Sequence, residues 1–147
     1  MLVKDAMSTG VVGIKEDTLL RSVVEQMVWR NVTTMPVVDD ENNITGVLTI
    51  RDVMLPLYPN FGDYIHDNVH ARDFEEMENS YKKVLEKKVV DVMTVKPMTV
   101  SADEPILKAA SYMGLRNLRR IPVADNGKLV GIISVSDINT ALFINKS

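Results

Sequence analysis

Residues 116–125 read RNLRRIPVAD, and residues 30–39 read RNVTTMPVVD. Both stretches contain an arginine–asparagine pair, a proline–valine pair and a final aspartate at the same spacing. When the comparison is extended to residues 3–39 and 89–125, the constant offset of 86 gives ten identities in 37 pairs. Ordinary composition would give roughly two by chance. The chain therefore contains an internal duplication, which decides the fold before any other feature does.

The second half of each copy matches after a single change of offset. The turn at residues 39–44 is one residue longer than the turn at residues 125–129, so the offset falls from 86 to 85. It then aligns GVLTIRDV at residues 46–53 with GIISVSDI at residues 131–138. Because the change falls in a turn, where insertions are tolerated, the two segments are copies of one unit.

Each copy predicts a strand, a helix, two strands and a second helix, in that order. The opening strands fall at residues 11–14 and 98–100, and we expect Asp17 and Asp103 to be the N-caps of the first helices. Apolar residues at helical spacing follow: Leu19, Leu20, Val23, Val24 and Met27 in copy one, and Ile106, Ala110 and Met113 in copy two.

The two strands after the first helix have clear local signals. Pro36 and Pro122 each predict an edge strand or a strand start, because proline cannot donate to a ladder. Asn126-Gly127 predicts a tight hairpin turn. The fold class is therefore mixed α/β, a tandem β-α-β-β-α repeat. One unit of about 50 residues buries too little surface to be stable alone, so the halves should pack together.

The boundaries that follow are copy one at residues 1–55, a helical linker insertion at residues 56–87, and copy two at residues 88–147. In the linker, Pro56 and Pro59 are expected to end the preceding helix. One apolar helical face then follows, made of Phe74, Met77, Tyr81, Val84 and Leu85.

Composition and charge exclude several classes of function. The net charge of -3 and the pI near 5.4 argue against nucleic acid as the main partner. The absence of cysteine excludes disulfides and thiolate metal sites. We see no secretion signal and no apolar run long enough to span a bilayer, so we expect a cytoplasmic protein without a membrane partner. No nucleophile–base pair or phosphate-binding glycine loop is visible, so we expect no enzymatic activity.

The repeated motifs resemble those of the CBS domain, the module named after cystathionine beta-synthase, which in tandem is called a Bateman module. The resemblance covers both copies and leaves out the linker. It rests on three motifs that occur twice and in the same order: Asp-x-Met at Asp5 and Asp91, the strand proline at Pro36 and Pro122, and Gly-x-x-Thr/Ser-x-x-Asp at Gly46 and Gly131.

This resemblance implies pseudo-twofold packing of the copies and two clefts that bind adenosine compounds such as AMP, ADP, ATP or S-adenosylmethionine. It also implies a homodimer and an effector protein that reads the bound state. Cleft A would combine Thr49, Asp52, Pro97, Met98, Arg119 and Arg120. Cleft B would combine Val11, Val12, Thr33, Thr34, Ser134 and Asp137.

The residue chemistry agrees with this assignment for cleft A. The Asp52 carboxylate only accepts hydrogen bonds, so it suits a ribose diol. Arginine pairs with phosphate oxygens, although neighbours such as Arg119 and Arg120 point to opposite faces of a strand, so one of them is expected to reach a ligand. Cleft B has Thr33 and Thr34 at the matching positions, so it lacks the cation.

Alternatives from the residues alone stay open. The Thr49–Asp52 and Ser134–Asp137 patterns are also typical of a capping box that binds nothing, and adjacent arginines are commonly solvated. A structural or interaction module with vestigial clefts, in which the linker helix contacts the partner, is the main alternative. A ligand of the S-adenosylmethionine or NAD type is another. His66 and His70 have the spacing of two metal ligands, but no third ligand is evident, so we expect no metal.

Overall fold

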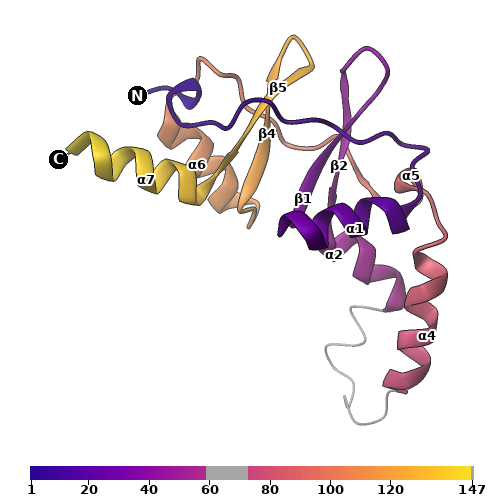
Figure 1. Ribbon diagram of the computed structural model, residues 1–147. Coiled ribbons are helices and arrows are strands. Elements are labelled where there is room, and N and C mark those ends of the chain that lie inside the picture. Colours follow the sequence, from indigo (N-terminus) through magenta and orange to yellow (C-terminus); the bar gives the residue numbers. More distant parts are fainter. Residues whose placement is uncertain (59–72, 147) are drawn as a thin grey trace. The chain divides into compact units, whose positions relative to one another are not determined.

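The computed structural model describes residues 1–58 and 73–146 and has the expected mixed α/β fold (Figure 1). Copy one contains η1 (Val3–Asp5), α1 (Leu20–Arg30), β1 (Thr34–Val38), β2 (Ile44–Thr49) and α2 (Ile50–Met54). η2 (Leu55–Leu57) lies at the boundary between copy one and the linker, and α4 (Phe74–Val84) lies within the linker. Copy two contains α5 (Val89–Val92), β3 (Thr94–Val95), α6 (Ile106–Leu115), β4 (Arg120–Asp125), β5 (Lys128–Ser134) and α7 (Val135–Lys146).

The strands follow the local signals in the sequence. β4 and β5 form an antiparallel hairpin whose two-residue turn is Asn126-Gly127, with φ angles of 50° and 81°, as a type I′ turn requires. β1, β2 and β3 form a second sheet in that order, so β1 lies at its edge. Pro36 and Pro122 therefore both lie on edge strands, as expected.

The first helices of the two copies end in the same way. Asn31 and Asn117, which the repeat preserves, both have a φ of 53°. Asn31 is the C-cap of α1, and its backbone N–H donates to the carbonyls of Met27 and Val28. Asparagine tolerates the left-handed conformation better than most residues, so the repeated asparagine is explained by helix termination.

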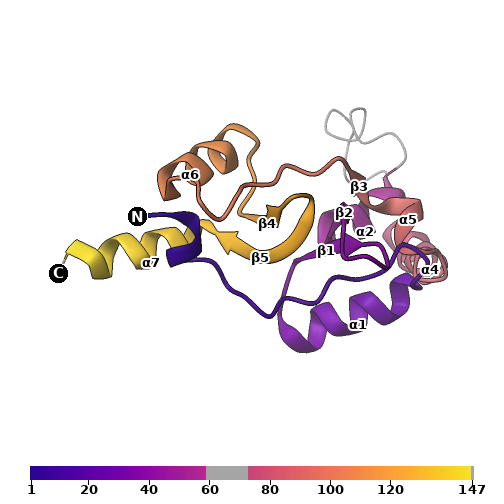
Figure 2. The same cartoon turned by 90° about the horizontal axis from the view of Figure 1, so that it is seen from above.

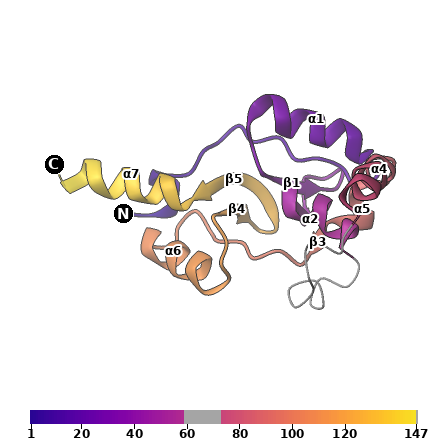
Figure 3. The ribbon, with the colours of Figure 1, turned by 90° about the horizontal axis from the view of Figure 1, so that it is seen from below.

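The chain forms two compact units that interleave the copies. Unit 1 consists of residues 1–13, 36–46 and 95–147, and unit 2 consists of residues 14–35 and 47–94. The opening segment of copy one thus belongs with the body of copy two, and the opening segment of copy two belongs with copy one. In unit 1, Figures 2 and 3 show the N-terminal segment and helices α6 and α7 around the β4–β5 hairpin.

The backbone hydrogen bonds of the two exchanged segments match pair by pair. In unit 1, the N–H of Val3 donates to Glu104 O at 2.9 Å, and the N–H of Ile106 donates to Met1 O at 3.0 Å. In unit 2, the repeat-related bonds run from Val89 to Thr18 O and from Leu20 to Lys87 O, both at 2.9 Å. Each copy therefore supplies its first residues to the other.

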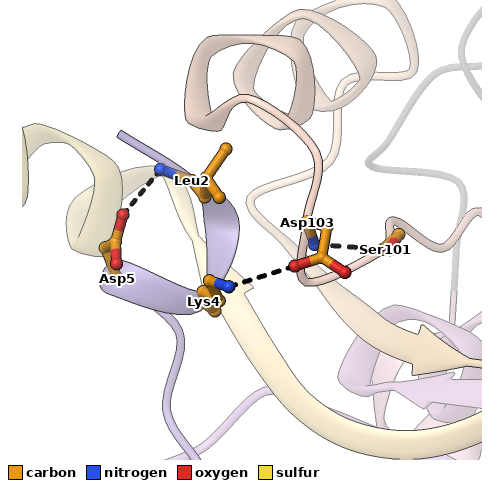
Figure 4. Close-up of polar contacts among 5 residues, drawn as sticks. All are labelled: Leu2, Lys4, Asp5, Ser101 and Asp103. Carbon is orange, nitrogen blue, oxygen red and sulfur yellow. Dashed lines mark hydrogen bonds and ion pairs between the residues drawn. The ribbon is translucent and has the colours of Figure 1, made fainter.

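The Asp-x-Met motif has a structural role in this exchange. The N–H of Leu2 donates to Asp5 Oδ2 at 2.7 Å, and the N–H of Lys88 donates to Asp91 Oδ2 at 2.9 Å. In copy one, Lys4 Nζ also lies 3.2 Å from Asp103 Oδ1, as Figure 4 shows. The repeated aspartates thus close the single helical turn that begins each copy.

Two expectations about the start of each copy are wrong. Asp17 and Asp103 are not N-caps, because α1 and α6 begin three residues later and Leu19 and Pro105 occupy the N-cap positions without a side-chain bond. Carbonyl groups of the exchanged segments accept from the first helical N–H groups instead. The two predicted opening strands are also absent as strands. Within residues 11–14 and 98–100, only Ile14 and Val100 form isolated bridges.

The core of unit 1 contains a residue of the exchanged N-terminal segment together with residues from the helices and strands of copy two. Val3 is fully buried and packs with residues from α6, β4, β5 and α7. The buried cluster consists of Val3, Val100, Ile106, Ala109, Met113, Ile121, Val123, Ile133 and Ile138. In unit 2, the α1 stripe is buried at Leu20, Val23, Val24 and Met27, whereas Leu19 is 48% exposed. Among the described helices, none combines the length and apolar character needed to cross a membrane.

The hairpin tips of both copies meet within unit 1. The N–H of Ile44 donates to Gly127 O at 2.9 Å, and the side-chain amide of Asn42 donates to Leu129 O at 2.9 Å. Asp39 organises the longer turn of copy one. Side-chain and backbone hydrogen bonds from Asn43 lower the pKa of Asp39 below its ordinary value.

Gly131 marks the place where the exchanged segment approaches β5 most closely. A Cβ there would lie 2.8 Å from Ser8 O and 2.9 Å from Met7 Sδ. We expect Gly131→Ala to lower the free energy of unfolding by about 1–3 kcal/mol, as overpacking does. Gly114→Ala is the matched control, since a Cβ in α6 meets nothing within 4 Å and should be neutral or stabilising. Equal midpoints of urea unfolding for the two variants would contradict this.

Candidate functional site

Thr49 and Asp52 lie at the junction between β2 and α2. The N–H of Asp52 donates to Thr49 Oγ1 at 3.2 Å, and the N–H of Thr49 donates to Asp52 Oδ2 at 2.9 Å. This reciprocal pair is a complete capping box. The structural interpretation of the Thr-x-x-Asp pattern is therefore confirmed for copy one.

Only one carboxylate oxygen of Asp52 takes part in the cap. The other oxygen, Oδ1, accepts a hydrogen bond from the Thr94 hydroxyl at 3.2 Å. Thr94 begins β3 and is exposed, and Asp52 is half-buried. Because each carboxylate oxygen can accept more than one hydrogen bond, capping leaves Asp52 able to accept from a ligand hydroxyl.

Ser134 and Asp137 repeat the capping box between β5 and α7. The two bonds measure 3.0 Å and 2.9 Å, and Ser134 is buried. Within the part of the chain that the structure describes, Asp137 Oδ1 makes no further hydrogen bond. Ser8 aligns with Thr94 in the repeat, but no bond from its hydroxyl to Asp137 is present. The two carboxylates thus have the same cap, but among the described residues only Asp52 accepts a further hydrogen bond, from Thr94.

The residues before each strand proline lie beside the cap of their own copy. In unit 1, the N–H of Val135 donates to Arg119 O at 3.0 Å, and Arg120 pairs with Ser134 across the β4–β5 ladder. In unit 2, the N–H of Ile50 donates to Thr33 O at 2.9 Å. The arginines and Ser134–Asp137 are therefore neighbours through the backbone.

Arg119 is exposed and Arg120 is half-buried. Neither side chain has a hydrogen bond or ion pair within residues 1–58 and 73–146. Two unpartnered guanidinium groups next to a helix start are suited to hold an anion.

The other residues that were predicted to line cleft A or cleft B lie in extended segments. Val11 is half-buried, Val12 is 74% exposed, and Pro97 and Met98 are half-buried. Thr34 opens β1 and is half-buried, whereas Thr33 is exposed.

The structure brings Thr49, Asp52 and Thr94 together in unit 2, and Arg120, Ser134 and Asp137 together in unit 1. The predicted cleft A joins Thr49 and Asp52 to residues of the other unit and stays a prediction, as does cleft B. Sequence reasoning missed Thr94, although its hydroxyl directly follows the Asp-x-Met motif. His66 and His70 lie outside the described residues.

The linker helix has a hollow of its own in unit 2. An open, mostly apolar hollow of about 540 Å³ lies between α4 and the end of copy one. It is lined by Met54, Leu57, Tyr58, Phe74, Met77, Glu78, Tyr81 and Lys82. None of these lining residues belongs to a capping box. The hollow is therefore a second candidate contact surface, which the interaction-module alternative would use.

Two copies of one α/β unit, each with a hydroxyl–carboxylate capping box at a helix start, make the chain a tandem-repeat α/β protein. A family model of the CBS domain matches residues 3–57 and 89–144, so the chain belongs to the CBS domain family. A CBS domain-containing protein of Dictyostelium discoideum is 29% identical, over 94% of this chain and 88% of that protein. An uncharacterized protein of Methanocaldococcus jannaschii is 30% identical, over 97% of this chain and 91% of that protein.

Solved structures agree with this membership. The crystal structure of CBSX2 in complex with AMP, a CBS-pair protein of Arabidopsis thaliana, has a TM-score of 0.76 and 29% sequence identity, and the match covers 99% of this chain and 98% of CBSX2. The CBS domain pair of protein MJ0100 has a TM-score of 0.72 at 22% identity, covering 100% of this chain and 98% of that one, and supports the fold alone.

Proposed function

We propose that the protein is a non-catalytic regulatory module that binds an adenosine nucleotide in cleft A, between its two CBS motifs. The observation that carries this proposal is Asp52 Oδ1, which lies outside the capping box and accepts only from an exposed hydroxyl among the described residues. CBSX2, which shares the fold at 29% identity, has been crystallised with AMP. AMP, ADP and ATP are therefore the first ligands to consider.

In this proposal Asp52 binds the ribose and at least one of the two arginines binds phosphate. A ribose diol offers two O–H donors, which match a carboxylate that only accepts. The ligand hydroxyl would replace or join the Thr94 hydroxyl at Oδ1. The side chains of Arg119 and Arg120 have no hydrogen bond or ion pair among the described residues, so binding a phosphate would break no existing ion pair.

A homodimer and an effector protein complete the proposal. The stripe from Leu20 to Met27 does not supply the dimer surface, because it is buried in the core of unit 2. Exposed apolar side chains follow it on α1, where Val28 is 68% and Trp29 is 81% exposed. On α7, Phe143 is 74% exposed. Apolar side chains of this size are suited to a subunit interface.

An interaction module with vestigial clefts is the second candidate. Both capping boxes are complete without any ligand, and the apolar hollow beside α4 offers a separate contact surface. In that case the linker helix would contact the partner, and adenosine compounds would have no effect on stability. Ligands of the S-adenosylmethionine or NAD type would show in the same measurement.

Thermal unfolding with a panel of adenosine compounds tests the proposal. At 100 times its Kd, a ligand that binds only the folded state adds about 2.7 kcal/mol, which raises the Tm of a chain of this size by several degrees. We expect AMP, ADP or ATP to give such a rise, and guanosine nucleotides to give none. Unchanged Tm values with AMP, ADP, ATP, S-adenosylmethionine and NAD would leave only the interaction module.

A further inference from the structure

Lys96 has a backbone conformation that its side chain disfavours. Its φ is 50°, in the left-handed region. Among the described residues, every other non-glycine residue with positive φ is an asparagine, which tolerates this region because its short side chain can bond locally. The repeat-related residue is Gly10, with a φ of 71°. Copy two therefore has a lysine where copy one has the residue that fits this conformation without cost.

Lys96 precedes a segment that bridges β4 in the parallel direction. Val100 and Val123 form a parallel bridge, flanked by bonds from Val100 N–H to Pro122 O at 3.2 Å and from Ala124 N–H to Val100 O at 2.9 Å. Parallel segments run in the same direction. Lys96 and Arg119 both lie four residues before this bridge, so the two backbone segments that carry these cations approach the bridge from the same direction.

Lys96 is exposed, and its amino group makes no hydrogen bond or ion pair with any described residue. The guanidinium groups of Arg119, which is exposed, and Arg120, which is half-buried, likewise make none. At the three repeat-related positions, copy one has Gly10, Thr33 and Thr34. Copy two thus has three positive side chains without a partner among the described residues on the two segments that lead into this bridge, and the cost of left-handed backbone at Lys96 accompanies one of them.

We propose that Lys96 is a third cationic contact of cleft A, and that this site selects a nucleoside with two or three phosphates over a monophosphate. The inference rests on the proposed function. A single phosphate carries about two negative charges, which equals the combined charge of Arg119 and Arg120, whichever of the two contacts it directly. The amino group of Lys96 therefore gains a negatively charged partner only when the nucleotide has a second or third phosphate. The sulfonium and amino groups of S-adenosylmethionine are cationic, so the same three charges disfavour that ligand.

Titration calorimetry with adenosine, AMP, ADP and ATP tests the assignment in the wild type and in Lys96→Gln. We expect the wild type to bind ADP or ATP about tenfold or more tightly than AMP, as one charge-assisted hydrogen bond allows. Lys96→Gln should remove that preference and leave AMP affinity within about twofold. Added salt should weaken ATP binding more in the wild type than in the variant.

Two further variants separate ligand contact from structure. Lys96→Gly should raise the Tm of the free protein by about 2–4 °C, because glycine adopts positive φ freely. It should also lower the affinity for ATP as much as Lys96→Gln does. Lys108→Gln removes a charge from α6, where Lys108 lies 3.9 Å from Glu104, and should leave all four affinities unchanged.

The outcomes are distinct. Binding of AMP and ATP with equal affinity, or equal losses for both in Lys96→Gln, overturns the polyphosphate assignment and leaves the proposed function standing. If none of the four compounds binds the wild type, both proposals are wrong.

Discussion

Val3→Asp is expected to lower the free energy of unfolding by several kcal/mol, on the order of 3–5, because it buries an unpaired carboxylate. Val3 is fully buried in the core of unit 1. Its repeat-related residue, Val89, is equally buried in unit 2. Since small domains are stable by only about 5–15 kcal/mol, either substitution removes a large part of the total. Urea unfolding followed by circular dichroism measures the loss.

Hydrogen exchange then shows on which copy each segment packs. Val3→Asp should lower amide protection in α6 of copy two, and Val89→Asp should lower it in α1 of copy one, because the segments are exchanged. Val90→Asp is the control, since Val90 is 45% exposed and should change stability little. Lost protection in α1 for Val3→Asp would show that each segment packs on its own copy.

The exchange of opening segments between the copies could not be predicted from the residues, because the duplication makes the two possible pairings equivalent. Val3 and Val89 belong to equivalent segments, and Leu20 and Ile106 belong to equivalent helices. Either pairing therefore buries similar side chains and forms the same backbone bonds. The choice depends on the path of the chain between the copies, and no local pattern of residues records that path.

The error at Asp17 and Asp103 has the same origin. An aspartate before an apolar helical stripe is a sound N-cap signal when the helix end must be satisfied locally. Here Leu20 and Ile106 donate to Lys87 O and Met1 O, which are distant in sequence. Features with local causes, such as the Asn126-Gly127 turn and the two capping boxes, were predictable. Contacts between distant segments, including the Thr94–Asp52 bond, were not.

Asp52→Ala is expected to weaken AMP binding by at least about 100-fold, because two hydrogen bonds from a ribose diol to a carboxylate are lost at roughly 1.5–3 kcal/mol each. It also removes half of the capping box, so the free protein should lose about 0.5–2 kcal/mol of stability. Asp137→Ala is the matched control. It removes the equivalent bond at α7 and should cost similar stability, with little effect on the nucleotide of cleft A.

Asp52→Asn separates the two roles of this side chain. The amide oxygen of asparagine can still accept from Thr49 N–H, which Asp52 Oδ2 now binds at 2.9 Å, so the cap persists. The amide nitrogen then replaces Oδ1 and can only donate, so it cannot accept from a diol. We expect this variant to keep most of its stability and to lose nearly as much AMP affinity as Asp52→Ala in calorimetric titrations. If Asp52 only caps the helix, AMP affinity should change only as far as stability changes. An Asp52→Asn variant that binds AMP as tightly as the wild type would therefore show that Asp52 has a structural role alone.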